Sequence, residues 1–135
     1  CSFFLSNLSF ACDALLGSWS CKTASEEKLM ANIYTDEAGL WLHYQKEVFE
    51  MGKFKVDGEE HADNSRRGVK MSHKAFCNSE SWMSFEWNQL YEAFGLKVKV
   101  THQLRMTEEG LKIDAKEERS GLDRPKSASF SCTAS

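Results

Sequence analysis

Two stretches decide the fold of this chain: Gly17-Ser18-Trp19-Ser20-Cys21 and Ser127-Ala128-Ser129-Phe130-Ser131-Cys132. In each, an aromatic residue stands two positions before a cysteine. Residues i and i+2 of an extended strand point to the same face, so each aromatic faces the same way as its cysteine. We expect these two strands to be neighbours, so that a Cys21–Cys132 disulfide closes a small antiparallel β-barrel.

The sequence holds five cysteines in 135 residues, and none of them forms a Cys-x-x-Cys pair. This usage favours structural disulfides over a zinc site, and it favours an oxidising compartment. After Cys21 and Cys132 are paired, we expect Cys12 to pair with Cys77. The alternative is that Cys77 is a free buried thiol, a common state of cysteine in a core.

The N-terminal residues 1–11 are apolar and contain no acidic side chain. They are either the remnant of a signal peptide or an N-terminal helix, in which Phe4, Leu8 and Leu15 recur at helical spacing. The apolar run is well short of the roughly 20 residues that a membrane-spanning helix needs, so we expect no stable membrane insertion. Residues 12–135 then form a single β-barrel domain, and we expect the protein to be periplasmic or secreted.

Composition excludes one class of partner. The net charge is −3, with 41% hydrophobic and 27% charged residues, which is ordinary for a globular domain. Lys and Arg are scattered among Glu and Asp, whereas nucleic-acid binding needs a concentrated basic face. We therefore expect no nucleic-acid partner.

The pattern along the chain is that of short strands joined by tight turns. Residues 96–101 alternate strictly between apolar and polar, and turn signals stand at 36–39, 57–58 and 107–110. The aromatic residues of the 82–94 segment recur at mixed spacings of three and four, which indicates one short helix that ends at Gly95. The predicted fold is all-β: one antiparallel meander of about eight strands that closes as a barrel, with one short helix late in the chain.

At Leu15-Leu16-Gly17-Ser18-Trp19-Ser20-Cys21 the chain resembles the lipocalin family, whose first strand carries Gly-x-Trp. More narrowly, this stretch resembles small bacterial periplasmic proteins with a lipocalin-like fold. The resemblance implies a meander barrel in which Trp19 closes one end. The sequence departs from true lipocalins because no long C-terminal helix follows the last strand. Avidin-like and fatty-acid-binding barrels are similar in size, but their residues are not recognised here.

A barrel of about eight strands either fills itself with side chains or holds one small ligand. We expect non-catalytic binding of a small, largely apolar ligand inside the barrel, through aromatic candidates. These are Trp41, Tyr44, Trp82, Phe85, Trp87, Tyr91 and Phe94. The alternative function is a protein-interaction module, such as a periplasmic inhibitor or stress factor, that uses the aromatic 82–94 segment.

The histidines give no firm site. His61 and Asp63 could join His73 as metal ligands, but their spacing is generic, and we expect solvated loop histidines and no metal. Some barrels of this fold group bind haem through a histidine, and His43 and His102 are the remote candidates for that role because both lie on predicted strands. No further feature supports a haem site, and we expect no cofactor. His73 stands four residues from Cys77, a proximity too common to indicate a nucleophile, and we expect no enzyme. The sequence leaves the oligomeric state open.

Overall fold

A computed structural model describes residues 12–46, 49–64, 66–121 and 123–135. The expectations for residues 1–11 lie outside this range. One 3₁₀ turn, η1 (Asp13–Leu15), precedes ten strands. The strands are β1 (Gly17–Lys22), β2 (Lys28–Asp36), β3 (Gly39–Lys46), β4 (Phe49–Lys55), β5 (His61–Asp63), β6 (Val69–Ser79), β7 (Trp82–Tyr91), β8 (Leu96–Thr107), β9 (Gly110–Arg119) and β10 (Lys126–Ala134).

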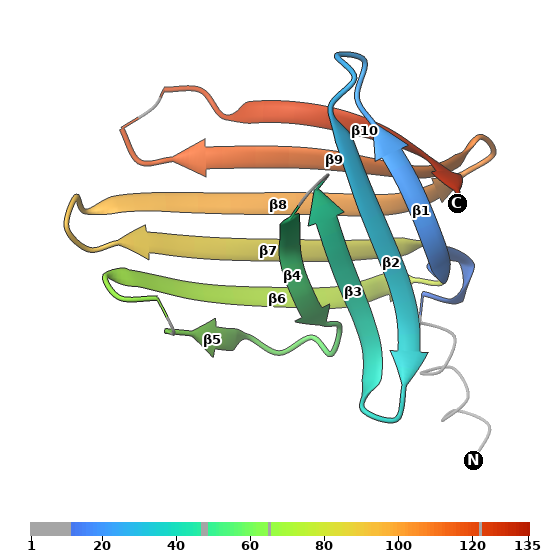
Figure 1. The fold of residues 1–135 in the computed structure, drawn as a ribbon, viewed down its shortest axis with the longest axis horizontal. Coiled ribbons are helices and arrows are strands. Elements are labelled where there is room, and N and C mark those ends of the chain that lie inside the picture. The colour runs from blue at the N-terminus through green and yellow to red at the C-terminus, as the bar shows by residue number, and fades with distance from the viewer. Residues whose placement is uncertain (1–11, 47–48, 65, 122) are drawn as a thin grey trace.

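All ten strands belong to one antiparallel sheet in the order β4-β3-β2-β1-β10-β9-β8-β7-β6-β5. The first and last strands pair with each other, which joins the two halves of the meander. Figure 1 shows β1 to β4 crossing β6 to β9 at a large angle, so the sheet curls over onto itself as a half-barrel. Phe54 of β4 contacts Phe85 of β7 across the interior, with ring centroids 4.6 Å apart. The predicted all-β antiparallel meander is confirmed.

The expected helix late in the chain is wrong. Strand β7 runs through the segment to Tyr91 and pairs with β6 on one side and β8 on the other. Met83, Phe85 and Trp87 are two residues apart, so all three side chains lie on the inner face of the strand. This period of two decides the structure of the segment, although its aromatic residues also recur at helical spacings. The chain turns only at residues 92–95, where Gly95 adopts a φ of 61°.

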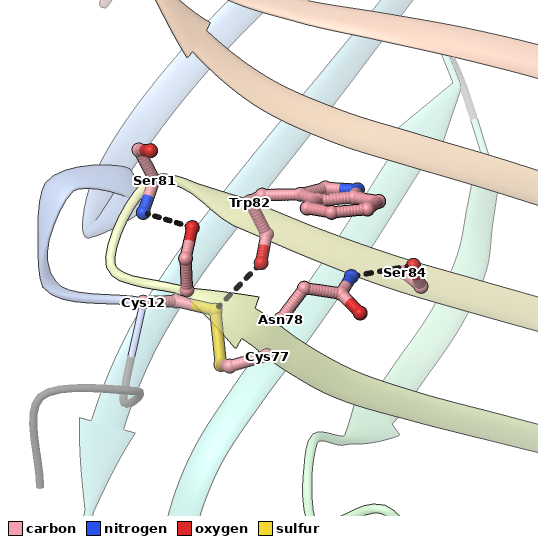
Figure 2. Close-up of a disulfide and its surroundings, with 7 residues drawn as sticks. Cys12, Cys77, Asn78, Ser81, Trp82 and Ser84 are labelled. Atoms are coloured by element: carbon pink, nitrogen blue, oxygen red, sulfur yellow. Dashed lines mark hydrogen bonds between the residues drawn. A yellow bond between two sulfur atoms is a disulfide. The ribbon is translucent and has the colours of Figure 1, made fainter. Parts of the chain in front are cut away.

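The two disulfides are the pairs expected from the sequence. Cys21 and Cys132 stand directly opposite each other on β1 and β10, with Cα atoms 4.0 Å apart. Cys12 bonds Cys77 and so ties the segment before β1 to the end of β6, near the Trp82 carbonyl (Figure 2). Both links lie in the buried core or beside it.

One end of the half-barrel is closed by the start of the chain. The Trp19 indole donates a hydrogen bond of 2.9 Å to the Leu15 carbonyl, and Leu15 is fully buried. The Ala14 amide donates to the Glu80 carbonyl in the β6–β7 turn. This end, with the turns at 37–38, 80–81 and 108–109, is called the closed end below. No helix in the described part of the chain is long and apolar enough to cross a membrane.

Candidate ligand cavity

The interior side chains of β7 to β10 form rows across the sheet, because residues opposite each other on neighbouring strands lie side by side. The register places these rows in order from the closed end toward the opposite, open end. They are Met83–Leu104–Ile113–Phe130, then Phe85–His102–Ala115–Ala128, then Trp87–Val100–Glu117–Lys126, and then Gln89–Val98–Arg119.

Burial and polarity change steadily along these rows. The first row is apolar, and its side chains are at most 6% exposed. The second row contains one polar side chain, His102, which is 6% exposed. The third and fourth rows carry Glu117, Arg119 and Lys126, of which Arg119 and Lys126 are exposed. The interior therefore passes from a sealed apolar floor to a charged mouth.

A cavity of about 470 Å³ opens between these rows and the facing strand β2. Its wall includes Leu29, Trp87, Val100, Ala128 and Phe130. Its rim includes both acidic and basic side chains, which are Glu27, Lys46, Glu117, Arg119 and Lys126. A volume of this size lies within the range of roughly 300–1,000 Å³ that small-molecule sites occupy in proteins.

The floor of the cavity holds one buried polar pair. The Tyr44 hydroxyl of β3 lies 2.9 Å from Nδ1 of His102 on β8. Burial lowers the pKa of His102 to about 4, so the ring is neutral at neutral pH. Burial also raises the pKa of the Tyr44 phenol above its ordinary value. Phe85 meets both rings, with centroids 5.8 Å from Tyr44 and 5.6 Å from His102.

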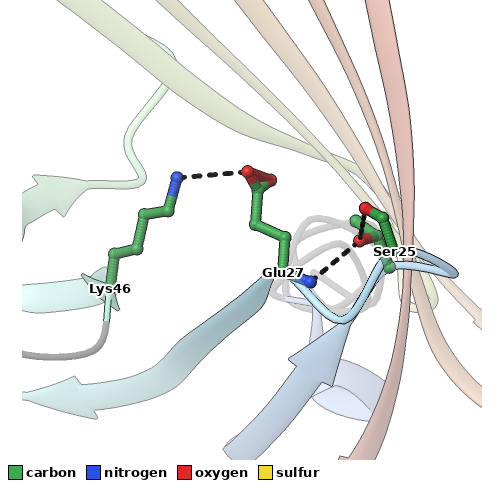
Figure 3. A network of polar contacts seen from close by, with 4 residues as sticks. Ser25, Glu27 and Lys46 are labelled. Atoms are coloured by element: carbon green, nitrogen blue, oxygen red, sulfur yellow. Dashed lines mark hydrogen bonds and ion pairs between the residues drawn. The ribbon is translucent and has the colours of Figure 1, made fainter.

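The mouth is built from side chains of opposite charge. Lys46 at the end of β3 reaches Glu27 in the β1–β2 turn, with Nζ and Oε1 3.4 Å apart (Figure 3). Nε of Arg119 donates to Oε2 of Glu117 at 2.9 Å. Lys126 stands opposite Glu117 in the β9–β10 register. Such exposed pairs stabilise a protein by roughly 0–1 kcal/mol each, so an incoming ligand can rearrange them at low cost.

A second hollow, of about 660 Å³, is larger and meets the first at the open end, where Gln89 and Arg119 line both, but it extends to other residues. Among its lining residues, Lys70 stands opposite Leu90 and Leu90 opposite Lys97. These positions alternate with the inner-face residues Gln89 and Val98, so they lie on the outer face of the sheet. This hollow is called the outer groove below. We favour the smaller cavity as the site because the buried side chains of Leu29, His102 and Phe130 line it inside the barrel, whereas Val98 is the one buried residue among the described residues that line the outer groove.

The structure divides the predicted ligand residues between the two faces of the sheet. Tyr44 and Phe85 are buried at the floor, and Trp87 lines the cavity. Tyr91, at the open end of β7, is half-buried and donates a hydrogen bond to Gln89 at 3.3 Å. These four residues are the part of the predicted set that lies on the inner face.

The other predicted ligand residues lie outside the cavity. Trp41 donates a hydrogen bond of 2.9 Å to Asp36 on the outer face of β3. Trp82 lies under the guanidinium of Arg105, 4.5 Å from the centre of its ring. Phe94 sits in the β7–β8 turn and is 84% exposed. The aromatic 82–94 segment therefore does not present one continuous surface, because its side chains alternate between the interior and the exterior.

The histidines near β5 join the edge of the sheet to the barrel interior, since His73 stands opposite Trp87 on the inner face and packs against Phe54, with ring centroids 4.9 Å apart. His61 stacks on His73, with centroids 5.3 Å apart, and its Nε2 lies 2.9 Å from an Asp57 carboxylate oxygen. Asp57, Glu59 and His61 have ligand atoms within 4.8 Å of one another. Burial alone would raise the pKa of Asp57, but hydrogen bonds from the Glu59 amide and from His61 lower it overall. The carboxylate is thus already engaged by His61.

Sequence reasoning missed the polar residues of the site. The sequence indicates His102 only as a haem candidate, and it does not predict Glu117 and Arg119 as lining residues. The parity of β9 could have found them, since Glu117 and Arg119 continue the alternation that begins with the buried Leu111 and Ile113. The pairing of His102 with Tyr44 has no local signal, because the two residues are 58 positions apart.

No protein-family model and no curated protein sequence matches this chain. Solved structures do match its fold. Secretory abundant heat soluble protein 4 from Ramazzottius varieornatus superposes with a TM-score of 0.55 at 11% identity, over 90% of this chain and 96% of that one. A Schistosoma mansoni fatty acid binding protein, solved in complex with arachidonic acid, superposes with a TM-score of 0.56 at 11% identity, over 94% and 98% of the two chains. The chain therefore has a fatty-acid-binding-protein-like β-barrel fold.

Proposed function

We propose that this protein is a non-catalytic carrier that binds a small, largely apolar ligand in the cavity between β2 and β7 to β10. The gradient of the interior rows carries this proposal. A ligand that lies against the apolar wall and the floor buries its own apolar surface. Each CH₂ group of the ligand that is buried there contributes roughly 0.8 kcal/mol to the binding free energy. The few polar groups at the floor and the mouth would orient the ligand.

Two further observations support the proposal. The fatty acid binding protein from Schistosoma mansoni has the same fold and was solved with arachidonic acid, an apolar chain with one polar end. Two disulfides suit a periplasmic or secreted carrier, because such bonds persist in oxidising compartments. Together they favour an exported protein that holds a lipid-like molecule.

The test is titration with Nile red, a neutral apolar dye whose emission rises when it leaves water. The variant A128F fills the second interior row, since Ala128 lines the cavity opposite Ala115. The matched control is S131F, which adds the same ring on the exposed outer face of the same strand. We expect wild type and S131F to bind the dye and A128F to lose at least about tenfold in affinity, since the added ring occupies the apolar volume. Equal binding by A128F, or no binding by wild type, would overturn the proposal.

A further inference from the structure

Among the described residues, no Lys or Arg side chain belongs to the two interior rows at the floor of the barrel, so an anion buried there would have no cationic partner. Around Tyr44 and His102 the contacts are with aromatic and aliphatic side chains, and the imidazole is neutral at neutral pH. A charged headgroup placed there would lose its hydration and gain only neutral hydrogen-bond donors. Burial of an unpaired charge is strongly unfavourable, so the floor suits the apolar end of a ligand.

Cations appear on the inner face only at the mouth, within the part of the chain that the structure describes. Arg119 lies two residues after Glu117 on β9, and Lys126 stands opposite Glu117 on β10. Lys46 approaches the same rim from β3. The rim thus carries three cations and the two carboxylates of Glu27 and Glu117. Its net charge is one positive charge, which is available to a ligand.

The charges in the turns also differ between the open end and the closed end of the barrel. In an antiparallel meander, alternate turns lie at the same end of the strands. The turns at the open end carry charges of both signs, which are Arg66, Arg67 and Arg124 with Glu26, Glu27, Glu92 and Asp123. All charged residues in the turns of the closed end, at 37–38, 80–81 and 108–109, are acidic, and they are Glu37, Glu80, Glu108 and Glu109. A protein field of this polarity attracts anions toward the mouth and away from the closed end.

We infer that the ligand is an anionic amphiphile that enters tail first and keeps its headgroup at the mouth, where Arg119 and Lys126 bind it. This inference rests on the proposed function and adds the ligand class and its orientation. The carboxylate of a fatty acid would share the Arg119 guanidinium with Glu117 or replace Glu117 there. Its chain would run past Val100 and Ala128 toward the Tyr44–His102 pair.

The experiment compares dodecanoate with 1-dodecanol, two ligands of equal chain length that differ in headgroup charge, by displacement of Nile red. The variant R119Q/K126Q removes the two mouth cations, and both side chains are exposed, so the fold should survive. The control K112Q removes a cation from the outer face of β9. We expect R119Q/K126Q to weaken dodecanoate roughly tenfold and dodecanol far less, since only the anion forms an ion pair with the two cations, and such pairs are stronger than a hydrogen bond to a neutral hydroxyl. K112Q should match wild type for both ligands.

Orientation is read separately on wild-type protein by NMR with spin-labelled stearates. A nitroxide at position 16 of the chain should broaden the methyl signals of Leu104 and Ile113, and one at position 5 should broaden the amide signals of Arg119 and Lys126. The reverse pattern, or a loss of dodecanoate affinity in H102N but not in R119Q/K126Q, would place the headgroup at the floor and overturn the inference. Binding of dodecanol alone would overturn the anionic class and leave the proposed function standing. Failure of both ligands to displace the dye would count against the proposed function itself.

Discussion

Acidification should destabilise the folded protein through His102. Burial lowers the pKa of this side chain from an ordinary value of 6.5 to about 4. Between these two values the unfolded chain binds a proton at His102 and the folded chain does not, so the free energy of unfolding falls as the pH falls. Each pKa unit corresponds to about 1.4 kcal/mol, so the full loss is about 3 kcal/mol. It levels off below the folded pKa, where both states are protonated.

The assay is urea unfolding followed by tryptophan fluorescence at a series of pH values from about 7 to about 4. The variant H102N keeps a side-chain amide near the Tyr44 hydroxyl but does not titrate. H102N is expected to be less stable than wild type at neutral pH, yet its stability should depend less on pH in this window. His73 also has a lowered pKa, caused first by burial and then by the charge of His61, and it titrates equally in both proteins. If wild type and H102N lose the same free energy on acidification, the reasoning about His102 is refuted.

The remaining predictions concern the disulfide that closes the sheet, one turn and the core. Removing the β1–β10 link in C21A/C132A should cost up to roughly 4–5 kcal/mol in the chain-entropy model, because the bond joins residues 111 positions apart; chemical denaturation against wild type measures the loss. G110A should lower the melting temperature more than G68A, since both glycines have positive φ but a Cβ at Gly110 would lie 2.7 Å from the Cys132 carbonyl oxygen; equal shifts would contradict this. L104A should cost about 2–5 kcal/mol, because Leu104 is fully buried in the first interior row, and a loss below about 1 kcal/mol would show that this row is not tightly packed.

Alternation and cysteine placement made much of this fold predictable. Strict alternation at residues 96–101 indicated β8, and the aromatic–cysteine spacing indicated that Cys21 and Cys132 lie on neighbouring strands. The helix expected in the 82–94 segment is absent because the segment is a strand up to Tyr91, with Trp82 and Trp87 on opposite faces. Trp82 and Phe85 are three residues apart, a separation that places two residues on one face of a helix but on opposite faces of a strand. The aromatic spacing therefore predicts a helix where β7 forms.

The ligand site was less predictable for a related physical reason. Aromatic side chains are large and apolar, so they suit a cavity wall, but they also cover an outer face when a cation or a carboxylate meets them. Trp41 bonds Asp36 and Trp82 packs under Arg105, and both contacts come from tertiary pairing that no local pattern specifies. The strand parity of Leu42 and Tyr44, both fully buried, would have placed Trp41 on the other face.

The central claim is that the interior cavity, and not the outer groove, binds an apolar ligand. The most direct test follows the methyl NMR signals of the protein during titration with 1-dodecanol. Val100 lines the cavity, and Leu90 lines the groove on the other face of the same sheet. The account predicts saturable shifts at Val100, Leu29 and Ala128 with Leu90 unmoved. Shifts confined to Leu90 and its neighbours, with the interior methyl groups unchanged, would contradict it.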